Sequence, residues 1–494
     1  MNNNQELKMI KFDGRALSSP ENGKKGGRPP IPILDIVEAL ITRYQHQGKL
    51  GLRVHKGSWR KYKNGKYIQI HKRDLQSEVI ALIQDDFRGY KISTSLLNDV
   101  MMNLESFKYC ALPTEFDVPC WIPNGEPAGN WFVMENGMVD IEKLATAIAD
   151  GSTAAIKDHT PDLFTTIAVS YNFNQAAQCP KWLKYLERVQ PDPVVREVIQ
   201  MMFGLALVPD TRFEVAFYLF GEGGTGKTVC LHVLTQLVGV ENVCCIPLSR
   251  FGNRFGLHDL SASLLNIIGD LPTAGEYSSS GAVEGMFKDI ISGGMIPVEK
   301  KFQDSFMAKA IARNIFASNS LPMFADRTSA IWERLRIIPF NEKIRGTGED
   351  NKNLKNELVL EELSGIFNWA VEGLAKLRNL RLFPETPYSA AIKAEHREVC
   401  DQEGSFLNDN YEFDSENTVG TLQLYAHYKN AMRENGYKVI GMGKLSEAVR
   451  RVFPKAVKTK LVLEDGKRIH VWNGLKSLQC CPVCPVGITD ARET

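Results

Sequence analysis

The sequence predicts an α/β protein with a parallel, doubly wound sheet at its core, a mixed α+β region before it and a small winged-helix-like domain after it. The apolar run 217–220 leads directly into a glycine-rich turn, and apolar residues at helical spacing follow. Two later strand candidates, 264–270 and 312–319, each end in a polar residue. Strands that are separated by helices after such a turn indicate a parallel sheet.

The glycine-rich turn at residues 221–228 fits the P-loop pattern G-x-x-x-x-G-K-[ST] in the strand-to-helix context that this pattern requires. Glycines let backbone N–H groups approach phosphate oxygens, and the helix N-terminus favours anions. We expect Lys227 to reach the β- and γ-phosphates of ATP or another NTP, and the Thr228 hydroxyl to bind Mg²⁺. A chance glycine-rich turn is the alternative, and the match at all four fixed positions argues against it. The predicted loop residues are Gly221, Glu222, Gly223, Gly224, Thr225, Gly226, Lys227 and Thr228.

Polar residues also close the strands that follow the P-loop. Asp270 ends the first of them and fits a Walker B acid, which helps to hold Mg²⁺ (here through water) in P-loop enzymes. Asn319 ends the next strand, where its side chain would orient the attacking water near the γ-phosphate. Between them, residues 296–306 predict a hairpin with Lys300 and Lys301 near its tip.

Size and composition indicate a soluble, cytoplasmic, multidomain protein. The 494 residues are enough for about three domains, and contents of 44% hydrophobic and 24% charged residues are ordinary for globular proteins. No apolar run approaches the roughly 20 residues that span a bilayer, and the polar N-terminus does not suit a secretory signal. Ten scattered cysteines suit a reducing cytosol. Because the net charge is only +1, affinity for nucleic acid must come from local patches.

The N-terminal part predicts helices and hairpins. Residues 58–70 form two alternating runs around an Asn-Gly dipeptide, the strongest short hairpin signal. The basic residues of this hairpin, mixed with Trp59, Tyr62 and Tyr67, suit base stacking and phosphate neutralisation. The favoured alternative is that the aromatic residues pack on a helix while the lysines face solvent. No Asp-x-Asp on a strand with a following His occurs in this part, so no primase active site is predicted.

The C-terminal part predicts the winged-helix-like domain. Helices over 422–432 and 445–452 precede a hairpin formed by 457–463 and 468–472. Basic residues on and beside the second helix suit a phosphate-binding face, and we favour DNA binding over a protein contact. These residues are Lys444, Arg450, Arg451 and Lys455. The cysteines at 480, 481 and 484 lack a fourth ligand at a usual spacing, so no zinc site is predicted.

Changes in composition and pattern divide the chain into six parts. The first part is polar and basic and cannot bury enough apolar surface to fold. The predicted parts are a disordered tail (1–30), an α+β domain (31–159), the P-loop ATPase domain (160–345), a helical segment (346–400), the winged-helix-like domain (401–476) and a tail (477–494).

Residues 160–345 resemble superfamily 3 helicases, and most of all the helicase module of phage and plasmid primase–helicases, a group related to the poxvirus uncoating NTPase. The resemblance rests on the P-loop together with several shorter matches. These are residues 160–164, 171–173, 179–183, 319–322, 332–334 and 338–340. The segments around Trp59 and around the hairpin signal Asn136-Gly137 are more loosely similar to the domain that precedes the helicase in that group.

The resemblance implies an AAA+-like ATPase that assembles as a ring, usually a hexamer, and moves along single-stranded DNA at a replication origin or fork. A separate primase or polymerase would be a partner. The resemblance places residues 221–228 at motif A, Asp270 at the acid of motif B and Asn319 at the polar residue of motif C. Asp270 lacks the adjacent Glu of the family pattern, which leaves the general base unassigned; Glu276 is a candidate.

Two further roles are implied by the resemblance. Lys300 and Lys301 lie where the family has its DNA-contacting hairpin. Arg334 falls at the arginine finger that reaches the nucleotide of a neighbouring subunit, and we expect it to have no obvious partner within the site of its own subunit. The alternative is a surface arginine paired with Glu333 or another carboxylate.

These observations favour an ATP-dependent DNA helicase for the replication of a phage, plasmid or integrated mobile element. An NTP-driven motor that packages or remodels DNA is the alternative within enzymes. A nucleotide-gated, origin-binding protein with little turnover is the alternative outside them. Translocation polarity, origin sequence and nucleotide preference do not follow from the sequence.

Overall fold

A five-stranded parallel sheet lies at the centre of the computed structural model. The structure describes residues 32–88, 90–106, 108–253, 256–269, 281–298, 306–322, 324, 330–347, 351–463 and 466–478. The strands of the sheet, in spatial order, are β12 (Val243–Cys244), β13 (Leu265–Ile268), β16 (Arg313–Ser318), β11 (Ala216–Phe220) and β17 (Leu335–Pro339). Every neighbouring pair among them is parallel, which confirms the predicted α/β core with a parallel sheet.

The sheet is buried on both faces because successive side chains of a strand point to opposite sides. On β11, Phe217 and Leu219 pack in one hydrophobic cluster with α6, α7 and α10. Ala216 and Tyr218 pack in a second cluster with α8 and α9. Helices therefore cover both faces of the strand that leads into the P-loop, as parallel sheets require. These helices are α6 (Pro193–Ala206), α7 (Lys227–Val238), α8 (Gly281–Ile291), α9 (Ala330–Arg334) and α10 (Leu354–Leu380).

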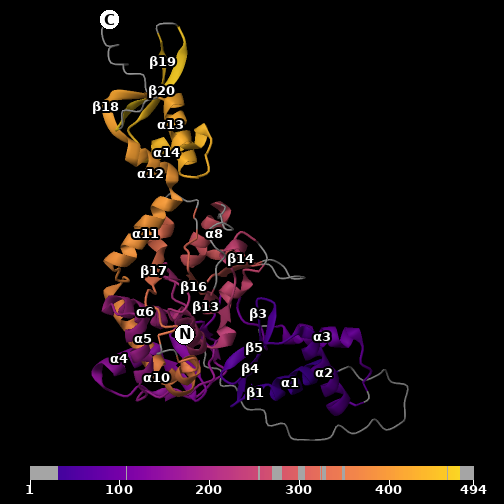
Figure 1. The fold of residues 1–494 in the computed structure, drawn as a ribbon. Coiled ribbons are helices and arrows are strands. Elements are labelled where there is room, and N and C mark those ends of the chain that lie inside the picture. Colours follow the sequence, from indigo (N-terminus) through magenta and orange to yellow (C-terminus); the bar gives the residue numbers. More distant parts are fainter. Residues whose placement is uncertain are drawn as a thin grey trace, which may run out of the picture.

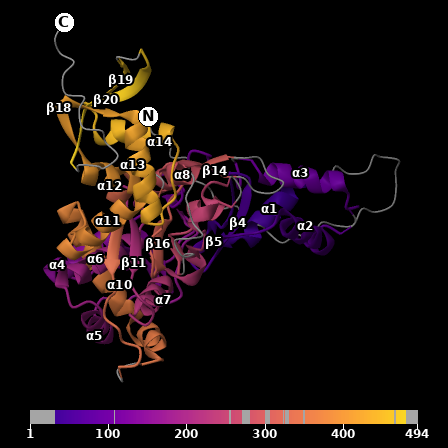
Figure 2. The same ribbon diagram turned by 45° about the horizontal axis from the view of Figure 1, so that its top comes forward.

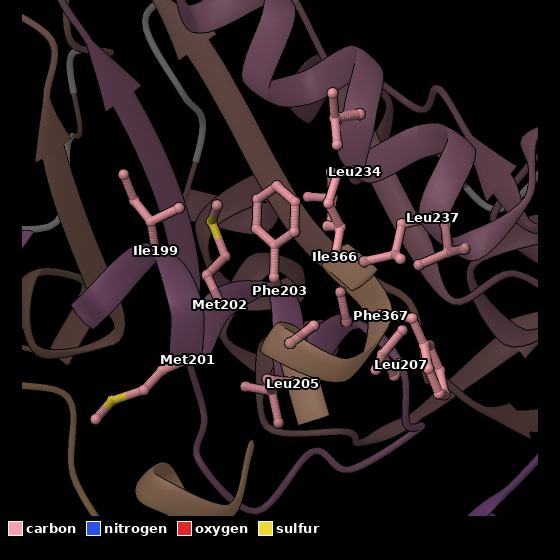
Figure 3. Close-up of a cluster of buried hydrophobic side chains, with 14 of the residues drawn as sticks. Ile199, Met201, Met202, Phe203, Leu205, Leu207, Leu234, Leu237, Ile366 and Phe367 are labelled. Atoms are coloured by element: carbon pink, nitrogen blue, oxygen red, sulfur yellow. The ribbon is translucent and has the colours of Figure 1, made fainter. Parts of the chain in front are cut away.

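Helix α10 crosses α6 at very short range. A side chain on Gly204 of α6 would come within 2.4 Å of a backbone carbonyl oxygen of α10, and one on Gly373 of α10 within 2.2 Å of a carbonyl oxygen of α6. Only glycine fits such an approach of two backbones. Figure 3 shows Phe203 of α6 in the cluster that also contains Leu234 of α7 and Ile366 of α10. The P-loop helix α7 and the long helix α10 thus share one core.

The N-terminal part has a hydrophobic core of its own. Helices α1, α2 and α3 pack against β3 and β4 of an antiparallel sheet, β3-β4-β5 (Figure 1). Trp59 is buried with these helices, while Tyr62 and Tyr67 are buried in a separate small cluster with Phe164. Packing of the hairpin aromatics is therefore confirmed, and these three rings are not exposed for base stacking. The elements are α1 (Ile33–Arg43), β3 (Leu52–His55), β4 (Ser58–Lys63), β5 (Lys66–Gln69), α2 (Lys72–Asp86) and α3 (Thr94–Leu104).

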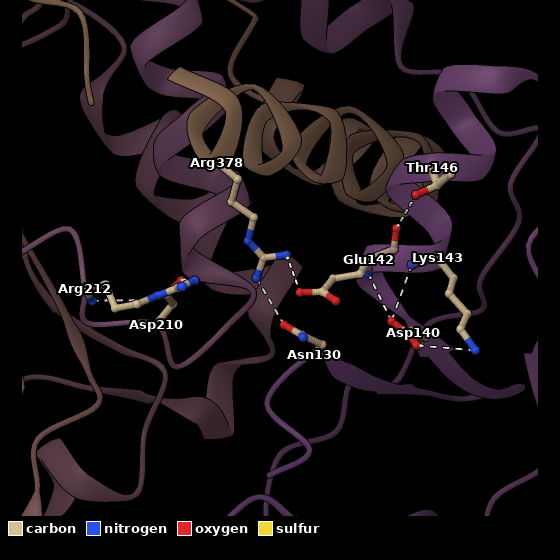
Figure 4. A network of polar contacts seen from close by, with 8 residues as sticks. All are labelled: Asn130, Asp140, Glu142, Lys143, Thr146, Asp210, Arg212 and Arg378. Atoms are coloured by element: carbon tan, nitrogen blue, oxygen red, sulfur yellow. Dashed lines mark hydrogen bonds and ion pairs between the residues drawn. The ribbon is translucent and has the colours of Figure 1, made fainter. Parts of the chain in front are cut away.

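A second antiparallel sheet joins the N-terminal part to the parallel sheet and its covering helices, which we call the ATPase core after the activity predicted for them. Its strands β7 and β8 form the hairpin predicted at Asn136-Gly137, and α4 follows them and packs on α10. Arg378 of α10 pairs with Glu142 of α4 at 3.1 Å, as Figure 4 shows. The hydrophobic core is thus continuous across the boundary expected at 159/160, and the domain limits stay a prediction. The elements are β7 (Trp131–Met134), β8 (Gly137–Asp140), α4 (Ile141–Asp150) and β9 (Ile156–Lys157).

The C-terminal part stands at one end of the molecule in both Figure 1 and Figure 2 and has a separate core. It follows α11 (Pro387–Cys400), which leads away from the ATPase core. The two predicted helices and the predicted hairpin are present, together with a helix and a strand that we did not predict, α12 and β18. The sheet order is β18-β20-β19. The elements are α12 (Gln402–Asn410), β18 (Tyr411–Gly420), α13 (Thr421–Glu434), α14 (Met442–Val452), β19 (Val457–Val462) and β20 (Arg468–Ser477).

Shorter elements connect these parts. The hairpin predicted between the Walker B strand and the Asn319 strand is present as an antiparallel pair, β14 and β15. Among the described residues, no helix is long and apolar enough to cross a membrane. The remaining elements are β1 (Gln45–His46), β2 (Lys49–Leu50), β6 (Cys120–Trp121), β10 (Leu163–Phe164), α5 (Pro180–Val189), η1 (Val240–Asn242), η2 (Leu248–Arg250), η3 (His258–Ser261), β14 (Met295–Val298) and β15 (Phe306–Lys309).

Candidate nucleotide site

The P-loop follows β11 directly, and α7 begins at Lys227. The backbone itself requires glycine at positions 221, 224 and 226. A side chain on Gly221 would lie 2.1 Å from the carbonyl oxygen of Phe340, and one on Gly226, where φ is +101°, would lie 2.8 Å from Val189 Cγ1. The predicted loop is therefore a tight turn packed between β17 and α5, and its exposed side carries the cradle in which phosphate groups would be bound.

Helix α5 packs against the P-loop and is hydrogen-bonded to it. The buried Tyr185 hydroxyl donates to the carbonyl of Gly226 at 2.8 Å, and burial raises the pKa of Tyr185 well above its usual value, so the hydroxyl keeps its proton. The N-terminus of α5 is capped in turn by buried Glu362 of α10, whose carboxylate accepts from the backbone N–H groups of Lys181 (2.9 Å) and Trp182 (2.8 Å). A chain of contacts thus fixes the P-loop relative to α10.

Lys227 lies over its own loop. Its Nζ donates to the carbonyl oxygens of Gly221 at 2.5 Å and Glu222 at 2.7 Å. Thr228, in the first turn of α7, is exposed, so its hydroxyl is open to a metal ion. The ammonium group and the hydroxyl thus flank a glycine cradle at a helix N-terminus. This donor set fits the phosphates of an NTP and a Mg²⁺ ion.

Asn319 is brought to the same edge of the sheet as the P-loop. It follows Ser318, which pairs with Phe220 in the parallel register of β16 and β11, and the N–H of Gly221 donates to the carbonyl of Ser318 at 3.2 Å. The Asn319 side chain is exposed there. Strand β13, which leads to Asp270, lies beside β16 with Ile268 opposite Phe316.

Several predicted residues lie outside the described residues. They are Asp270, predicted as the Walker B acid, the predicted hairpin lysines Lys300 and Lys301, and the candidate base Glu276. Their predicted roles in Mg²⁺ binding, DNA contact and proton transfer stay predictions. Of the described site residues, those of the P-loop and Asn319 are gathered at the carboxyl edge of the sheet.

Arg334 lies at the other edge of the sheet. It immediately precedes Leu335, which pairs with Ala216 at the start of β11, whereas the P-loop follows the end of β11. At about 3.3 Å per residue, the five residues of β11 separate the two edges by roughly 16 Å. Arg334 therefore cannot contact a nucleotide on its own P-loop.

Arg334 has partners in its own chain outside the P-loop site, as the alternative of a pair with another carboxylate predicts. Its Nη2 pairs with Glu214 Oε2 at 2.7 Å, its Nε donates to Ser292 Oγ at 3.3 Å, and its Nη1 donates to the carbonyl of Ala330 at 3.0 Å. Glu214 lies just before β11, and parallel pairing brings it beside the start of β17. The pair is partly exposed, with 24% of the arginine and 47% of the glutamate side chain accessible. The finger role itself stays a prediction.

Sequence reasoning missed one basic residue at the P-loop. The backbone N–H groups of Ile344 and Arg345 both donate to the carbonyl of Gly224, at 3.0 and 3.2 Å. A side chain on Gly224 would meet Arg345 Cβ at 2.8 Å, so the aliphatic stem of Arg345 runs over the loop. No motif marks this residue, because its position depends on the turn after β17.

The C-terminal basic residues do not form one free face. Arg451 is held by a bidentate ion pair with Asp401, whose longer contact is 2.7 Å. Arg450 lies over the Trp472 ring at 5.8 Å, and Lys455 over the Phe413 ring at 5.8 Å. Arg451 is therefore engaged within the chain, and the phosphate-binding face predicted for this domain loses one of its four members.

Comparisons with known proteins point to helicase-like proteins. Residues 219–334 match a family whose description is "Family of unknown function (DUF5906)". The chain is 22% identical over 389 residues to "Putative helicase L207/L206" of Acanthamoeba polyphaga mimivirus, and 21% identical over 324 residues to "Putative helicase 121R" of Invertebrate iridescent virus 3. These matches cover 71% and 58% of this chain but only 38% and 34% of the two viral proteins, so the chain spans little more than a third of their length.

Solved structures show the same fold over most of the chain. Two apo structures of the NrS-1 C-terminal region each superpose with a TM-score of 0.50 and cover 89% of this chain and 98% of theirs. Sequence identity is 12% and 14%, so these matches speak for the fold alone. The arrangement of the ATPase core and the parts around it is thus shared with a known structure.

Proposed function

We propose that the protein is an ATP-dependent DNA helicase that hydrolyses ATP or another NTP with Mg²⁺ while it moves along single-stranded DNA. The observation that carries this proposal is the glycine cradle with Lys227 and Thr228, at the same sheet edge as Asn319. The names of the two viral relatives support a helicase over another NTP-driven protein. Replication of a phage, plasmid or integrated mobile element is the setting that the resemblance to superfamily 3 helicases favours.

In this proposal the residues of the carboxyl edge have distinct tasks. The P-loop backbone and Lys227 bind the β- and γ-phosphates, and Asn319 orients the attacking water. Thr228 and Asp270 hold the Mg²⁺ ion, Asp270 through water. The metal ion supplies charge that stabilises the transferring phosphoryl group. The tight packing of Gly221 and Gly226 keeps the donors in place before the nucleotide binds, which is the condition for electrostatic stabilisation of the transition state.

The position of Arg334 supports assembly as a ring. Because Arg334 lies at the sheet edge away from its own P-loop, it can take part in hydrolysis only at the nucleotide of another copy. Its ion pair with Glu214 is partly exposed, and such pairs contribute only about 0–1 kcal/mol, so a neighbouring nucleotide can compete for the arginine. A homo-oligomer, in the family's usual form a hexamer, provides this arrangement.

The proposal is tested by ATP turnover with and without single-stranded DNA, followed by strand displacement on a forked duplex. We expect DNA to stimulate turnover and the forked duplex to be separated, with Lys227→Ala as the inactive control. Stimulated turnover without displacement would instead indicate a packaging or remodelling motor. Binding of origin DNA with negligible turnover would contradict the enzyme assignment.

Contact between the β14–β15 hairpin and DNA is tested separately. Replacing both Lys300 and Lys301 with alanine removes two predicted phosphate contacts. The slope of log affinity against log salt for single-stranded DNA should then fall by roughly 1.4, since each contact with a single strand releases about 0.7 counterion. An unchanged slope would show that these lysines do not contact the strand.

A further inference from the structure

A cleft of about 350 Å³ lies between the N-terminal sheet and the ATPase core. One wall is formed by β3 and β4, and the other by η3 and the end of β15. Figures 1 and 2 both show the N-terminal sheet on the side of the ATPase core where β14 is located. We call this space the basic cleft. Its titratable lining residues are His55, Lys56, Arg60, Asp117, His258 and Lys309.

The basic cleft has more positive than negative charge. Lys56, Arg60 and Lys309 contribute cations, and Asp117 is the only carboxylate among the described lining residues. Across the described part of the chain, none of the three cations forms an ion pair with a carboxylate. Arg60 is partly buried, and this burial lowers the pKa of its guanidinium from the usual value. A half-buried, unpaired arginine is stabilised by an anion that enters the cleft.

His55 adds a neutral polar atom to this lining. The residue is only 7% exposed, and its Nε2 atom is buried without a hydrogen-bond partner in the structure. Burial first, and then the neighbouring charges of Lys56 and Arg60, lower the pKa of His55 to about 4, so the ring is neutral near pH 7. A neutral imidazole has one acceptor nitrogen, and Nε2, the nitrogen without a partner in the structure, can accept from a hydroxyl or N–H group.

We infer that the basic cleft binds a phosphate group of a nucleic-acid strand. Arg60 and Lys309 would contact the phosphate oxygens, and His55 would accept a hydrogen bond from a polar group of the attached nucleoside. The cleft combines unpaired cations with a lone acceptor, which matches a nucleotide unit better than a bare anion. Lys309 lies on β15, so the cleft continues the surface of the hairpin to which DNA contact is assigned. The inference rests on the proposed function in one respect, since the expected source of the phosphate is the translocating strand.

The test is equilibrium binding of a fluorescent oligo-dT to the full chain across a salt series. We expect Arg60→Gln to weaken binding roughly tenfold, as for loss of one charge-assisted hydrogen bond, and to lower the salt slope by about 0.7. Lys309→Gln, an exposed position with little risk to folding, should lower the slope by the same amount. The matched control is Lys61→Gln, because Lys61 is next to Arg60 but lies on the other face of β4, near Glu78 at 3.9 Å.

A second arm identifies the source of the phosphate. Binding of inorganic phosphate is followed by ³¹P line broadening in a Lys227→Ala background, with and without Arg60→Gln. Weaker oligo-dT binding in both cleft variants supports the strand. Unchanged oligo-dT binding together with loss of phosphate broadening would instead assign the cleft to a free phosphate group.

If neither ligand responds to Arg60→Gln and Lys309→Gln, or if Lys61→Gln has the same effect as they do, the inference is wrong. A wild-type protein that binds no oligo-dT contradicts the proposed helicase function. Even then the phosphate arm still tests the basic cleft, so the two failures are distinguishable.

Discussion

The two edges of the central sheet carry similar polar residues in different environments. At the carboxyl edge, Lys227 donates to backbone carbonyls of its own loop and the Asn319 side chain is exposed. At the amino edge, Arg334 is held by Glu214, and Arg313 is buried and donates to the carbonyls of Asp210 and Val215. The polar groups at the first edge thus lie on a loop or at the surface, whereas those at the second connect the starts of the strands to the chain around them.

The role of an arginine or lysine at a strand end thus depends on which edge of the sheet it occupies. Open carboxyl edges are where parallel α/β sheets bind ligands, so polar groups there are available for chemistry. A polar group at the amino edge stabilises the fold unless a second copy of the protein reaches it. Arg334 is the amino-edge residue for which a role in hydrolysis, at the nucleotide of a second copy, is predicted.

Arg334→Ala is expected to have the largest effect. As a finger that acts on the nucleotide of a neighbour, its loss should leave ATP binding and assembly intact and reduce hydrolysis by roughly 10³–10⁵, the range known for arginine fingers in GTPases. Mixing Arg334→Ala with Lys227→Ala should partly restore activity, because a hybrid interface joins an intact P-loop to an intact finger. ATP turnover of the two variants, alone and mixed, measures this.

Glu214→Gln is the matched control for this variant. It removes the charge that holds Arg334 but keeps the arginine. If Arg334 served only to stabilise the fold, both variants would show the same small loss of stability and normal hydrolysis. Every described charged group at the amino edge discussed above would then have a structural role alone. Mixed rings that stay inactive would also contradict the finger role.

Lys227→Ala tests the carboxyl edge. Removing a group that stabilises charge on the transferring phosphoryl should lower NTP turnover by a hundred-fold or more, which corresponds to several kcal/mol of transition-state stabilisation. Circular dichroism and thermal unfolding should match the wild type, because the Lys227 ammonium donates to the carbonyls of Gly221 and Glu222 within the P-loop itself. Near-normal turnover in a folded variant would show that the P-loop is not the catalytic site.

Arg313→Met tests the amino edge as a structural element. Arg313 is 4% exposed, and burial lowers the pKa of its guanidinium to about 10. The substitution removes the donor that Arg313 supplies to two carbonyls, and we expect the free energy of unfolding in urea to fall by about 3 kcal/mol. Hydrolysis per folded molecule should not change. Arg212→Met is the comparison at the exposed end of the same edge: 76% of that side chain is exposed, but it holds the Asp210 carboxylate, which is 9% exposed, so a smaller loss of about 1 kcal/mol is expected.

Gly221→Ala has the smallest expected effect. It tests the packing of the P-loop without changing a side chain that is predicted to bind the nucleotide. The added methyl group would lie 2.1 Å from the Phe340 carbonyl oxygen, which forces the loop to shift at a cost of about 2 kcal/mol. Gly223→Ala meets nothing within 4 Å and should be neutral. Hydrogen exchange of β11 and α7 without nucleotide should be faster only in the first variant. Equal exchange in both would mean that the P-loop is not held by β17.

The sequence predicts the parts of this molecule whose signals are local. The P-loop, the strands that end at Asp270 and Asn319, and the Asn-Gly hairpin at 136–137 all depend on residues close together in the chain. β18 was not predicted because its exposed, mostly polar residues lack an apolar alternation, and it is held by pairing with β20.

Site residues that depend on distant partners could not be predicted in the same way. Glu214 and Arg334 are 120 positions apart, and only the parallel pairing of β11 with β17 brings them together. Glu362 supports the P-loop through α5 across a separation of 180 positions. Neither contact has a motif, because a single carboxylate at such a distance looks like any other surface acid in the sequence.

The close crossing of α6 and α10 sets a lower limit on the length of a truncated version that still folds. Sequence motifs place the end of the ATPase domain near residue 345, before α10 begins. A protein cut there would expose the faces of α6 and α7 that α10 covers, and each large apolar side chain left uncovered costs about 1.5–3 kcal/mol. It would also lose Glu362, the cap of α5. The smallest piece that can keep its P-loop in place therefore extends through Leu380, well beyond the last residue with a predicted role in hydrolysis.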